Sequence, residues 1–309
     1  MSNEKPGRTG GIIVAAGETS ADGKSNPLLK IGSITVIKRI VLTFQRAGIS
    51  PIVVVTGYRG EDIEYHLSDY GVIFLRNEEY EKSQMLDSAK IGFRYIKDKT
   101  DQVVFTPVNV PMVTPDTIMK LINSGEPLIV PSYQGKAGHP LLIDNQLLPD
   151  ILSYEGAYGL RGAVQGLNVT RKLMEVEDEG IILDMEDMDR LDDLLKEHNE
   201  NIYHPFLRIS IEKESSFFNA RTKFLLMLIK ETHSVRDACK HIGLSYSKAW
   251  SMLNTLEEEL GIAVVERVHG GSNGGNTYLT REGLKFLENY MEFEQNVRKF
   301  AENEFKRLF

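Results

Sequence analysis

Short apolar stretches alternate with amphipathic stretches over residues 11–199, and this alternation limits the fold more than any other feature of the chain. Runs such as PIVVV, at residues 51–55, have the length of one strand and the Val and Ile content of a buried one. Strands that alternate with helices build a mostly parallel sheet covered on both faces, so the sequence predicts an α/β N-terminal domain. The expected strands are Ile12–Ala16, Pro51–Thr56, Val72–Leu75, Val103–Pro107 and Leu128–Pro131, and the expected helices are Val36–Arg46, Asp62–Leu67, Leu86–Ile96 and Thr117–Ile122.

The pattern changes at the polar, proline-containing stretch His198–Phe206, which is predicted to be a linker. The sequence therefore predicts two domains, residues 8–200 and residues 201–309. The second domain is expected to hold one strand, three helices, two short strands around the loop HGGSNGG, and a long terminal helix. The strand is expected at Leu207–Glu212, and the helices at Arg221–Glu231, Val235–Ile242, Ser247–Leu260 and Arg281–Phe309.

Charge is divided unevenly between the two predicted domains. Residues 1–205 contain 21 Lys and Arg against 30 Asp and Glu, whereas residues 206–309 contain 15 against 14. Within residues 208–256, eight basic residues accompany four acidic ones. A locally basic segment on a chain of net charge −8 predicts a polyanionic partner for the second domain only.

Cysteine content and hydropathy indicate the compartment. The one cysteine, Cys239, excludes an internal disulfide and fits a reducing compartment. The polar start of the chain lacks the apolar core of a signal peptide, and the apolar runs are too short to span a bilayer. We therefore expect a cytoplasmic protein with no membrane partner.

The tract SVRDACKHIGLSYSKAWSMLNTLEEELG has the pattern of a helix, a tight turn and a second helix. Ala238 would bury one face of the first helix, Gly243 would permit the turn, and Ser245 would cap the second helix. The hairpin VVERVHGGSNGGNTYLT follows as a wing whose glycine-rich tip suits a phosphate backbone. Together they predict a winged helix-turn-helix domain that binds double-stranded DNA. The predicted DNA-contacting residues are Ser245, Tyr246, Ser247, Lys248, Ser251, Arg267 and Asn276.

These residues resemble the winged-helix domain of the molybdate-dependent transcriptional regulator family. The resemblance runs from Leu207 to Tyr290 and is densest at GLSYSKAW, LEEELG and GGSNGGNTYLT. It implies a DNA-binding transcriptional regulator, and the alternative is a winged helix that serves only protein contacts. Trp250 is interpreted as packing under the wing rather than as a base contact.

The terminal segment Arg281–Phe309 carries two apolar stripes at three- and four-residue steps. A long helix with two such stripes predicts burial against a partner chain, and hence a homodimer. Packing against the N-terminal domain of the same chain is the alternative. The first stripe is Leu284, Leu287, Met291, Val297 and Ala301, and the second is Phe286, Tyr290, Phe293 and Phe300.

The stretch VAAGETSADGKSNPLLKIG, at residues 14–32, follows a predicted buried strand and has the glycines and small polar residues of a phosphate-binding loop. A P-loop has four residues between its first glycine and its Gly-Lys pair, whereas five residues separate Gly17 from Gly23. The backbone N–H groups of a P-loop must converge on one phosphate, so an extra residue argues against that assignment.

The loop resembles instead the nucleotide-binding loop of the molybdenum cofactor nucleotidyltransferases, a MobA-like family that joins CMP or GMP to molybdopterin. The resemblance continues through PIVVVTGY, NEEYEKSQMLDSAKIG, VNVPMVTPDTI, LIVPSYQGKAGHPLLI, AYGLRGAV and ILDMEDMDRLDDL, and covers residues 11–195. It implies a Rossmann-like fold with a pocket for a nucleotide or a molybdopterin-related ligand. The predicted ligand-binding residues are Ala15, Ala16, Gly17, Gly23, Lys24, Asn26, Asn77, Ser88 and His139. Of these, Asn77, Ser88 and His139 match the pocket motifs of the family, as do Tyr80, Gly138, Pro140, Gly159 and Arg161, whereas Lys24 could restore the charge that is lost at Asn26.

The charged positions of the catalytic centre of the family depart from its pattern. Ala21 stands where the family has an arginine that binds triphosphate, Asn26 replaces the loop lysine, and Asn109 replaces a metal-binding aspartate. The second metal position is retained as Asp184. An asparagine offers Mg²⁺ only a neutral oxygen, so a site at Asn109 and Asp184 would lose one formal charge. A positioned arginine contributes on the order of 10³-fold to phosphoryl transfer.

The sequence therefore predicts a transcriptional regulator whose degenerate nucleotidyltransferase-like domain senses a ligand. That ligand would be a nucleotide or a molybdopterin-related compound, with Mg²⁺ as the metal that the family resemblance implies. The first alternative is an active nucleotidyltransferase that transfers CMP from CTP, or GMP from GTP, to molybdopterin with release of pyrophosphate and also binds DNA. The second is a binding scaffold without DNA affinity.

Overall fold

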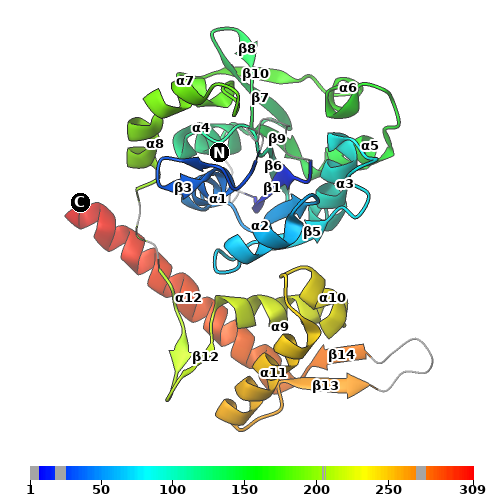
Figure 1. Cartoon of the computed structure of the whole chain (residues 1–309), viewed down its shortest axis with the longest axis vertical. Helices are drawn as coiled ribbons and strands as arrows, with labels where there is room; N and C mark the ends of the chain where they lie inside the picture. The colour runs from blue at the N-terminus through cyan, green and yellow to red at the C-terminus, as the bar shows by residue number, and fades with distance from the viewer. Residues whose placement is uncertain (1–6, 18–25, 204, 206, 269–275) are drawn as a thin grey trace, which may run out of the picture. The chain divides into compact units, whose positions relative to one another are not determined.

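The computed structural model describes residues 7–17, 26–203, 205, 207–268 and 276–309 (Figure 1). The chain divides into two compact units. The first comprises the residues up to Ile63 together with Val72–Tyr203, and the second comprises Glu64–Gly71 together with the residues that follow Tyr203. The sequence-based division after residue 200 stays a prediction. Within the described ranges, no helix is long and apolar enough to cross a membrane.

An eight-stranded, mostly parallel sheet forms the centre of the first unit. Its strands are β1 (Thr9–Ala15), β4 (Ile52–Thr56), β5 (Ile73–Arg76), β6 (Gln102–Pro107), β7 (Leu128–Tyr133), β8 (Lys136–Ala137), β9 (Leu141–Asp144) and β10 (Lys172–Glu175). They lie in the order β10-β7-β9-β6-β1-β4-β5, with β8 paired to β7. β1 is parallel to both neighbours, so Ile13 is opposite Val54 on one side and Thr106 on the other. All residues of β1 and β4 are buried, which explains their continuous apolar sequences.

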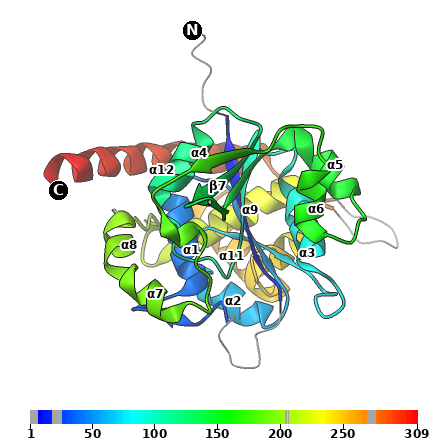
Figure 2. The same ribbon diagram turned by 90° about the horizontal axis from the view of Figure 1, so that it is seen from above.

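Helices cover both faces of this sheet, with α1 (Val36–Arg46) and α4 (Pro115–Ile122) on one face and α3 (Met85–Ile96), α5 (Leu148–Ser153) and α6 (Gly159–Gln165) on the other (Figure 2). α1 has the bounds that the sequence predicts, because the Thr35 hydroxyl accepts the Lys38 backbone N–H at 3.4 Å and caps the helix. The predicted α/β, Rossmann-like fold is confirmed. The remaining elements of the unit are the first turn of α2 (Gly60–His66), which crosses the boundary at Ile63, α7 (Met188–Asp193), α8 (Leu195–Asn201), the short hairpin β2 (Lys30–Ile31) and β3 (Ile34–Thr35), and the 3₁₀ turns η1 (Asn145–Leu147) and η2 (Glu179–Ile181).

Three strands of the sheet escape sequence-based prediction, and β8, with only two residues, is too short to give a pattern. β9 is antiparallel to both β6 and β7, and it is the strand that interrupts the otherwise parallel order. Its apolar run is only three residues long and follows a proline, Pro140, so it lacks the length that identifies a buried strand. β10 has a mostly exposed, charged sequence, KLME, which carries no strand pattern.

The predicted linker begins later than His198, because His198 lies within α8 and is only 2% exposed. Its Nε2 is 3.0 Å from the Val113 carbonyl oxygen, and its Nδ1 is 3.1 Å from Nη1 of the fully buried Arg39. Burial, helped by the Arg39 charge, lowers the pKa of His198 to about 4. The ring is therefore neutral, donating from Nε2 and accepting at Nδ1. A polar sequence does not reveal a histidine whose partners are 85 and 159 residues away.

The second unit contains the helix-turn-helix and wing that the sequence predicts. Gly243 has a φ of 58° in the turn, and the Ser245 hydroxyl accepts the Lys248 backbone N–H at 3.3 Å as an N-cap. Ala238, Ala249 and Leu253 are fully buried, so the two helices face a common core as expected. The elements are β11 (Ile211–Glu212), β12 (Ser216–Phe218), α9 (Ala220–Thr232), α10 (Val235–Lys240), α11 (Tyr246–Leu260), β13 (Val265–Val268), β14 (Asn276–Leu279) and α12 (Arg281–Leu308).

The predicted strand Leu207–Glu212 is shorter than expected. Only its last two residues form β11, which pairs antiparallel with β12. The wing strands β13 and β14 pair in register, with Arg267 opposite Thr277. The expected glycine-rich tip, residues 269–275, lies outside the described residues.

α12 is the long terminal helix that the sequence predicts, but its two apolar stripes are buried only at the start. Leu287 and Tyr290 are 2% and 3% exposed, and the Tyr290 ring lies edge-on to the Phe218 ring at 4.6 Å. Further along, Phe293 is 52% exposed and Phe300 is 67% exposed. The first part of α12 therefore belongs to the core of the second unit, and the homodimer stays a prediction.

Candidate functional site

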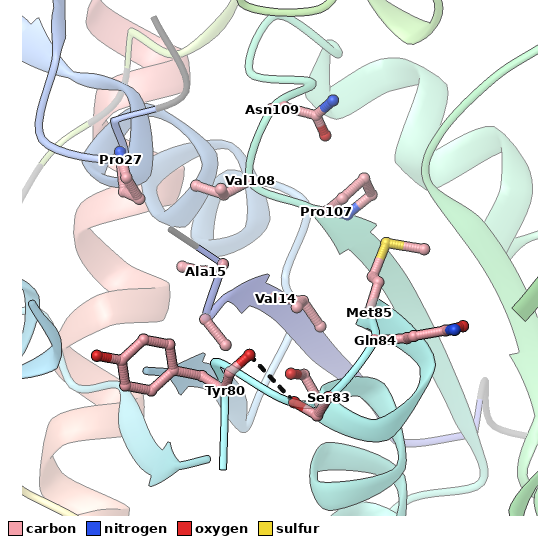
Figure 3. A pocket seen from close by; sticks show the side chains of 13 residues that line it. Val14, Ala15, Pro27, Tyr80, Ser83, Gln84, Met85, Pro107, Val108 and Asn109 are labelled. Carbon is pink, nitrogen blue, oxygen red and sulfur yellow. Dashed lines mark hydrogen bonds between the residues drawn. The ribbon is translucent and has the colours of Figure 1, made fainter. Parts of the chain in front are cut away.

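A cavity of about 250 Å³ opens at the carboxyl ends of β1 and β6, beside the start of α3 (Figure 3). Open α/β sheets bind their ligands at this edge, and the volume lies at the small end of the range for ligand pockets. The lining comes from the end of β1, from the turn before β2, from the start of α3 and from the segment that follows β6. The described lining residues are Val14, Ala15, Ala16, Gly17, Pro27, Tyr80, Ser83, Gln84, Met85, Ser88, Pro107, Val108 and Asn109.

Two serine hydroxyls of this cavity are held by Asn77, whose side chain is 5% exposed. Its Nδ2 donates to Ser83 Oγ at 2.7 Å and to Ser88 Oγ at 2.9 Å, and its Oδ1 accepts the Glu79 backbone N–H at 3.1 Å. The amide uses the hydroxyl oxygens as acceptors, so the Ser88 O–H is left to donate to a ligand. Asn77 thus positions the serines and does not line the cavity itself.

The described lining of the cavity carries no formal charge. Its polar groups are the hydroxyls of Ser83, Ser88 and Tyr80, the amides of Gln84 and Asn109, and backbone groups. Such a lining can hydrogen-bond a ring or a ribose, and its backbone N–H groups can donate to a phosphate oxygen. It does not supply the fixed cations that stabilise the charge of a reacting triphosphate.

The donor set does not fit a divalent metal ion. Asn109 offers a neutral amide oxygen, while Asp184 accepts the Glu186 backbone N–H at 2.7 Å and does not line the cavity. In the part of the chain that the structure describes, no group of three or more His, Cys, Asp or Glu side chains is placed to hold a metal ion. No catalytic step through a metal follows from these residues, and the metal assignment of Asn109 and Asp184 stays a prediction.

The other predicted ligand-binding residues fall into three groups. Ala15, Ala16, Gly17 and Ser88 line the cavity. The Asn26 side chain accepts the Leu28 backbone N–H at 2.9 Å and shapes its own turn. Ala21, Gly23 and Lys24 lie outside the described residues.

His139 belongs to the packing of the first unit rather than to the cavity lining. Burial lowers the pKa of its ring to about 4, so the ring is neutral at physiological pH. Its Nδ1 is buried and has no hydrogen-bond partner among the described residues, and its ring centroid is 6.3 Å from that of Phe105. The side chain is therefore a packing group with an unsatisfied nitrogen.

Several lining residues were not identified from the sequence. Ser83, Gln84 and Met85 approach the cavity because they immediately precede the first turn of α3 or begin it. They lie within the motif NEEYEKSQMLDSAKIG, but serine, glutamine and methionine singly carry no binding signal. Only the motif as a whole could have directed attention to them.

The seven predicted DNA-contacting residues of the second unit are all exposed. Ser247, Lys248 and Ser251 follow the capping residue Ser245 along the first turns of α11, opposite the buried stripe. Lys248 forms no ion pair with any described residue, so its charge is available to a partner. Tyr246 is 50% exposed beside them.

The wing strand β13 lies against α11 through a cation–π contact. The Arg267 guanidinium carbon is 3.7 Å from the centroid of the Trp250 ring, and Trp250 packs partly buried against the core of the unit. The interpretation of Trp250 as packing under the wing is confirmed. Asn276, on β14, donates to the Tyr278 hydroxyl at 3.0 Å.

The C-terminal part of the chain is similar in sequence to curated regulators. It is 39% identical over 77 residues to the transcriptional regulator ModE of Yersinia pestis, a match that covers 24% of this chain and 28% of that protein. It is 31% identical over 100 residues to the molybdenum-pterin-binding protein MopB of Rhodobacter capsulatus, covering 32% of this chain and 37% of that protein. The chain thus spans 28% and 37% of the lengths of these two relatives.

The first unit shares its fold with a solved nucleotidyl transferase from Methanothermobacter thermautotroptrophicus, with a TM-score of 0.53 and 22% sequence identity. The match covers 62% of this chain and 98% of that chain. Sheet order, cavity and winged helix together define a nucleotidyltransferase-fold domain joined to a winged helix-turn-helix unit. The chain belongs to the family of the MobA-like NTP transferase domain, whose sequence pattern matches residues 11–172.

Proposed function

We propose that this protein is a DNA-binding transcriptional regulator whose nucleotidyltransferase-like domain senses a nucleotide or a molybdopterin-related ligand. The observation that carries the proposal is the exposed face of α11, where Ser247, Lys248 and Ser251 stand beside a wing and Lys248 has no ion-pair partner among the described residues. An exposed polar and basic helix face next to a wing is the arrangement that winged-helix proteins insert into the major groove.

Sensing rather than catalysis is supported by the composition of the cavity. The described lining presents hydroxyls, amides and backbone but no charge, and the donor set does not fit a metal ion. A site of this kind holds a ligand without the electrostatic groups that accelerate transfer of a nucleotidyl group. A Cβ added at Gly17, directly after β1, would meet no described atom within 4 Å, so a ligand can approach the backbone there.

The relatives of the C-terminal part support a role in molybdenum-linked regulation. One is named as a transcriptional regulator and another as a molybdenum-pterin-binding protein. The MobA-like first domain joined to such a C-terminal part favours a molybdopterin-related ligand over an unrelated nucleotide.

A homodimer is part of the proposal. Met291, Phe293 and Phe300 of α12 are 41%, 52% and 67% exposed, which leaves apolar surface on one helix. Exposed apolar surface of this kind marks an interaction site, and a second copy of α12 presents the same exposed residues, Met291 from the first stripe and Phe293 and Phe300 from the second. Dimeric winged-helix proteins read two half-sites one helical turn apart, so the operator would be a pseudo-palindrome.

Two measurements on the full chain test the proposal. Genomic DNA fragments are selected on the protein, and the affinity of an enriched duplex is compared with that of a scrambled duplex at the same salt concentration. Calorimetry is then run against CTP, GTP, ATP and molybdopterin, each with and without Mg²⁺. We expect sequence-specific duplex binding and at least one bound ligand whose affinity is insensitive to Mg²⁺. Equal affinity for enriched and scrambled duplexes would refute the regulator assignment.

An active nucleotidyltransferase that also binds DNA is the competing function, and membership of the MobA-like NTP transferase family favours it. It predicts Mg²⁺-dependent binding of CTP or GTP and release of pyrophosphate with molybdopterin. The scaffold alternative predicts neither duplex binding nor turnover. The two measurements therefore separate all three functions.

A further inference from the structure

A continuous stack of two cations and two aromatic rings crosses the face of the winged helix. The Arg267 guanidinium of β13 lies 3.7 Å from the Trp250 ring centroid, and the Trp250 ring meets the Tyr246 ring edge-on at 6.1 Å and 79°. The Arg236 guanidinium carbon of α10 is 5.9 Å from the centroid of the Tyr246 ring. We call the residues Arg236, Tyr246, Trp250 and Arg267 the cation–aromatic stack.

The stack joins the three elements that a winged helix brings to DNA. Arg236 comes from the first helix of the helix-turn-helix, the two rings stand one turn apart on α11, and Arg267 comes from the wing. In helix-turn-helix complexes the first helix crosses the phosphate backbone while the second enters the major groove. The two cations therefore belong to the two elements that flank the groove-reading helix.

Both guanidinium groups retain free donors. Arg236 and Arg267 are exposed, and neither forms an ion pair with a described residue. A guanidinium carries five N–H donors, and a contact with an aromatic ring does not neutralise its charge. A guanidinium that rests against a ring and has no ion-pair partner among the described residues is available to phosphate oxygens.

We propose that Arg236 and Arg267 are a pair of phosphate-binding residues on either side of the recognition helix, and that Trp250 is a positioning residue that orients Arg267. The proposal rests on the proposed DNA-binding function and adds Arg236, which the sequence did not single out. Phosphate contacts fix the register of a protein on the duplex without reading its sequence. Ser247, Lys248 and Ser251 are then left to contact base edges.

The salt dependence of binding measures the phosphate contacts directly, because log K falls with log salt by about 0.9 for each neutralised phosphate. The full chain and its variants are titrated against a labelled mixed-sequence duplex at several salt concentrations. Arg236→Ala and Arg267→Ala should each make the slope shallower by about 0.9, and the double variant by about twice that. Lys299→Ala removes the same charge from an exposed position late in α12 and should leave the slope unchanged.

Trp250 is tested by a double-mutant cycle. Trp250→Ala should weaken duplex binding roughly 2- to 12-fold in the wild-type background, because Arg267 must then be ordered on binding. In the Arg267→Ala background the same change should have no effect, whereas a general structural defect would weaken binding in both backgrounds. Trp250→Phe keeps an aromatic face and should restore most of the affinity.

The stack can also be observed without DNA. Trp250 is the one tryptophan of the sequence, so its fluorescence should change in Arg267→Ala and stay unchanged in Lys299→Ala. Wild-type binding with unchanged slopes in Arg236→Ala and Arg267→Ala would overturn this inference and leave the regulator function standing. Absence of duplex binding by the wild type, or preference for single-stranded RNA, would overturn the proposed function itself.

Discussion

Substituting Gly17 with valine should weaken ligand binding and leave the fold intact. Gly17 lines the cavity directly after β1, and a Cβ added there would meet no described atom within 4 Å. Its φ lies outside the left-handed region, so a side chain is not strained there. The valine side chain would therefore extend into open space, which is the space that the proposed ligand occupies.

The expected magnitudes separate the effect of Gly17→Val on ligand affinity from its effect on the free energy of unfolding. Replacing a glycine at a compatible backbone position stabilises a protein by about 0.4–1 kcal/mol through the unfolded chain, so the free energy of unfolding should change by no more than about 1 kcal/mol. A ligand kept away from the backbone loses at least one hydrogen bond from a backbone N–H to its charged phosphate, and such a bond contributes about 1.5–3 kcal/mol to binding. Its affinity should fall roughly 10- to 150-fold.

Two other glycines provide the comparison. A Cβ at Gly57 would lie 2.5 Å from the Ala16 carbonyl oxygen and 2.7 Å from Tyr80 Cβ, so Gly57→Ala should destabilise the first unit by about 1–3 kcal/mol. A Cβ at Gly166 would come no closer than 3.4 Å to a neighbour, so Gly166→Ala should change neither stability nor binding.

The assay is calorimetry of the full chain against GTP, CTP and molybdopterin, with urea unfolding followed by far-UV circular dichroism. We expect Gly17→Val to unfold like the wild type and to bind each ligand of the wild type roughly 10- to 150-fold more weakly. A variant that binds as tightly as the wild type would refute the placement of the ligand at the end of β1. A variant destabilised by more than about 3 kcal/mol would refute the open space at Gly17.

Four further predictions follow from the same residues. With CTP or GTP, molybdopterin and Mg²⁺, we expect no measurable pyrophosphate release, and turnover within about a hundredfold of a family enzyme would contradict a degenerate centre. Lys248→Ala should weaken operator binding by about 1–3 kcal/mol and relax sequence preference in a fluorescence-anisotropy titration; an unchanged preference would exclude a base contact. Asn77→Ala removes hydrogen bonds to Ser83 and Ser88 and should lower the free energy of unfolding, measured by urea titration, by about 2–3 kcal/mol. An unchanged free energy of unfolding would contradict a stabilising role for these hydrogen bonds. The fold lowers the pKa of His198 to about 4 from an ordinary value of 6.5. Between these values the unfolded chain binds a proton at this ring and the folded chain does not, so the free energy of unfolding is highest above pH 6.5 and falls by about 3 kcal/mol as the pH falls to 4. Urea unfolding of wild type and His198→Asn across that range checks this, and identical pH slopes would contradict it.

The sequence specified those parts of the fold whose signals are local. α1 was predicted with its observed bounds because an amphipathic stretch begins at a capping threonine and ends before a glycine turn. The helix-turn-helix was predicted because Ala238, Gly243 and Ser245 each satisfy a local requirement of helix burial, turn or cap. β9 lacks such a signal, since its place between β6 and β7 depends on pairing with distant strands.

The candidate site was only partly accessible from sequence, for the same reason. Ala15, Ala16 and Gly17 were found because a glycine follows a buried strand, which is a local pattern. The support of Ser88 by Asn77, and the burial of His198 against Arg39, arise from contacts that only the folded chain creates. Arg236 was overlooked because its significance lies in a stack with residues of two other elements.

We propose that a ligand in the cavity at the carboxyl ends of β1 and β6 controls the affinity of the winged helix for DNA. The most direct measurement is the operator affinity of the full chain, by fluorescence anisotropy, across a titration of whichever ligand calorimetry identifies. Allosteric coupling typically amounts to about 5- to 150-fold, and by reciprocity operator DNA must change ligand affinity by the same factor. We predict a change within that range for the wild type, and for Gly17→Val a change that begins only at roughly 10- to 150-fold higher ligand concentration. Without ligand, the operator affinities of Gly17→Val and the wild type should be equal. An operator affinity that stays constant up to saturation of the wild type with every bound ligand would contradict the account.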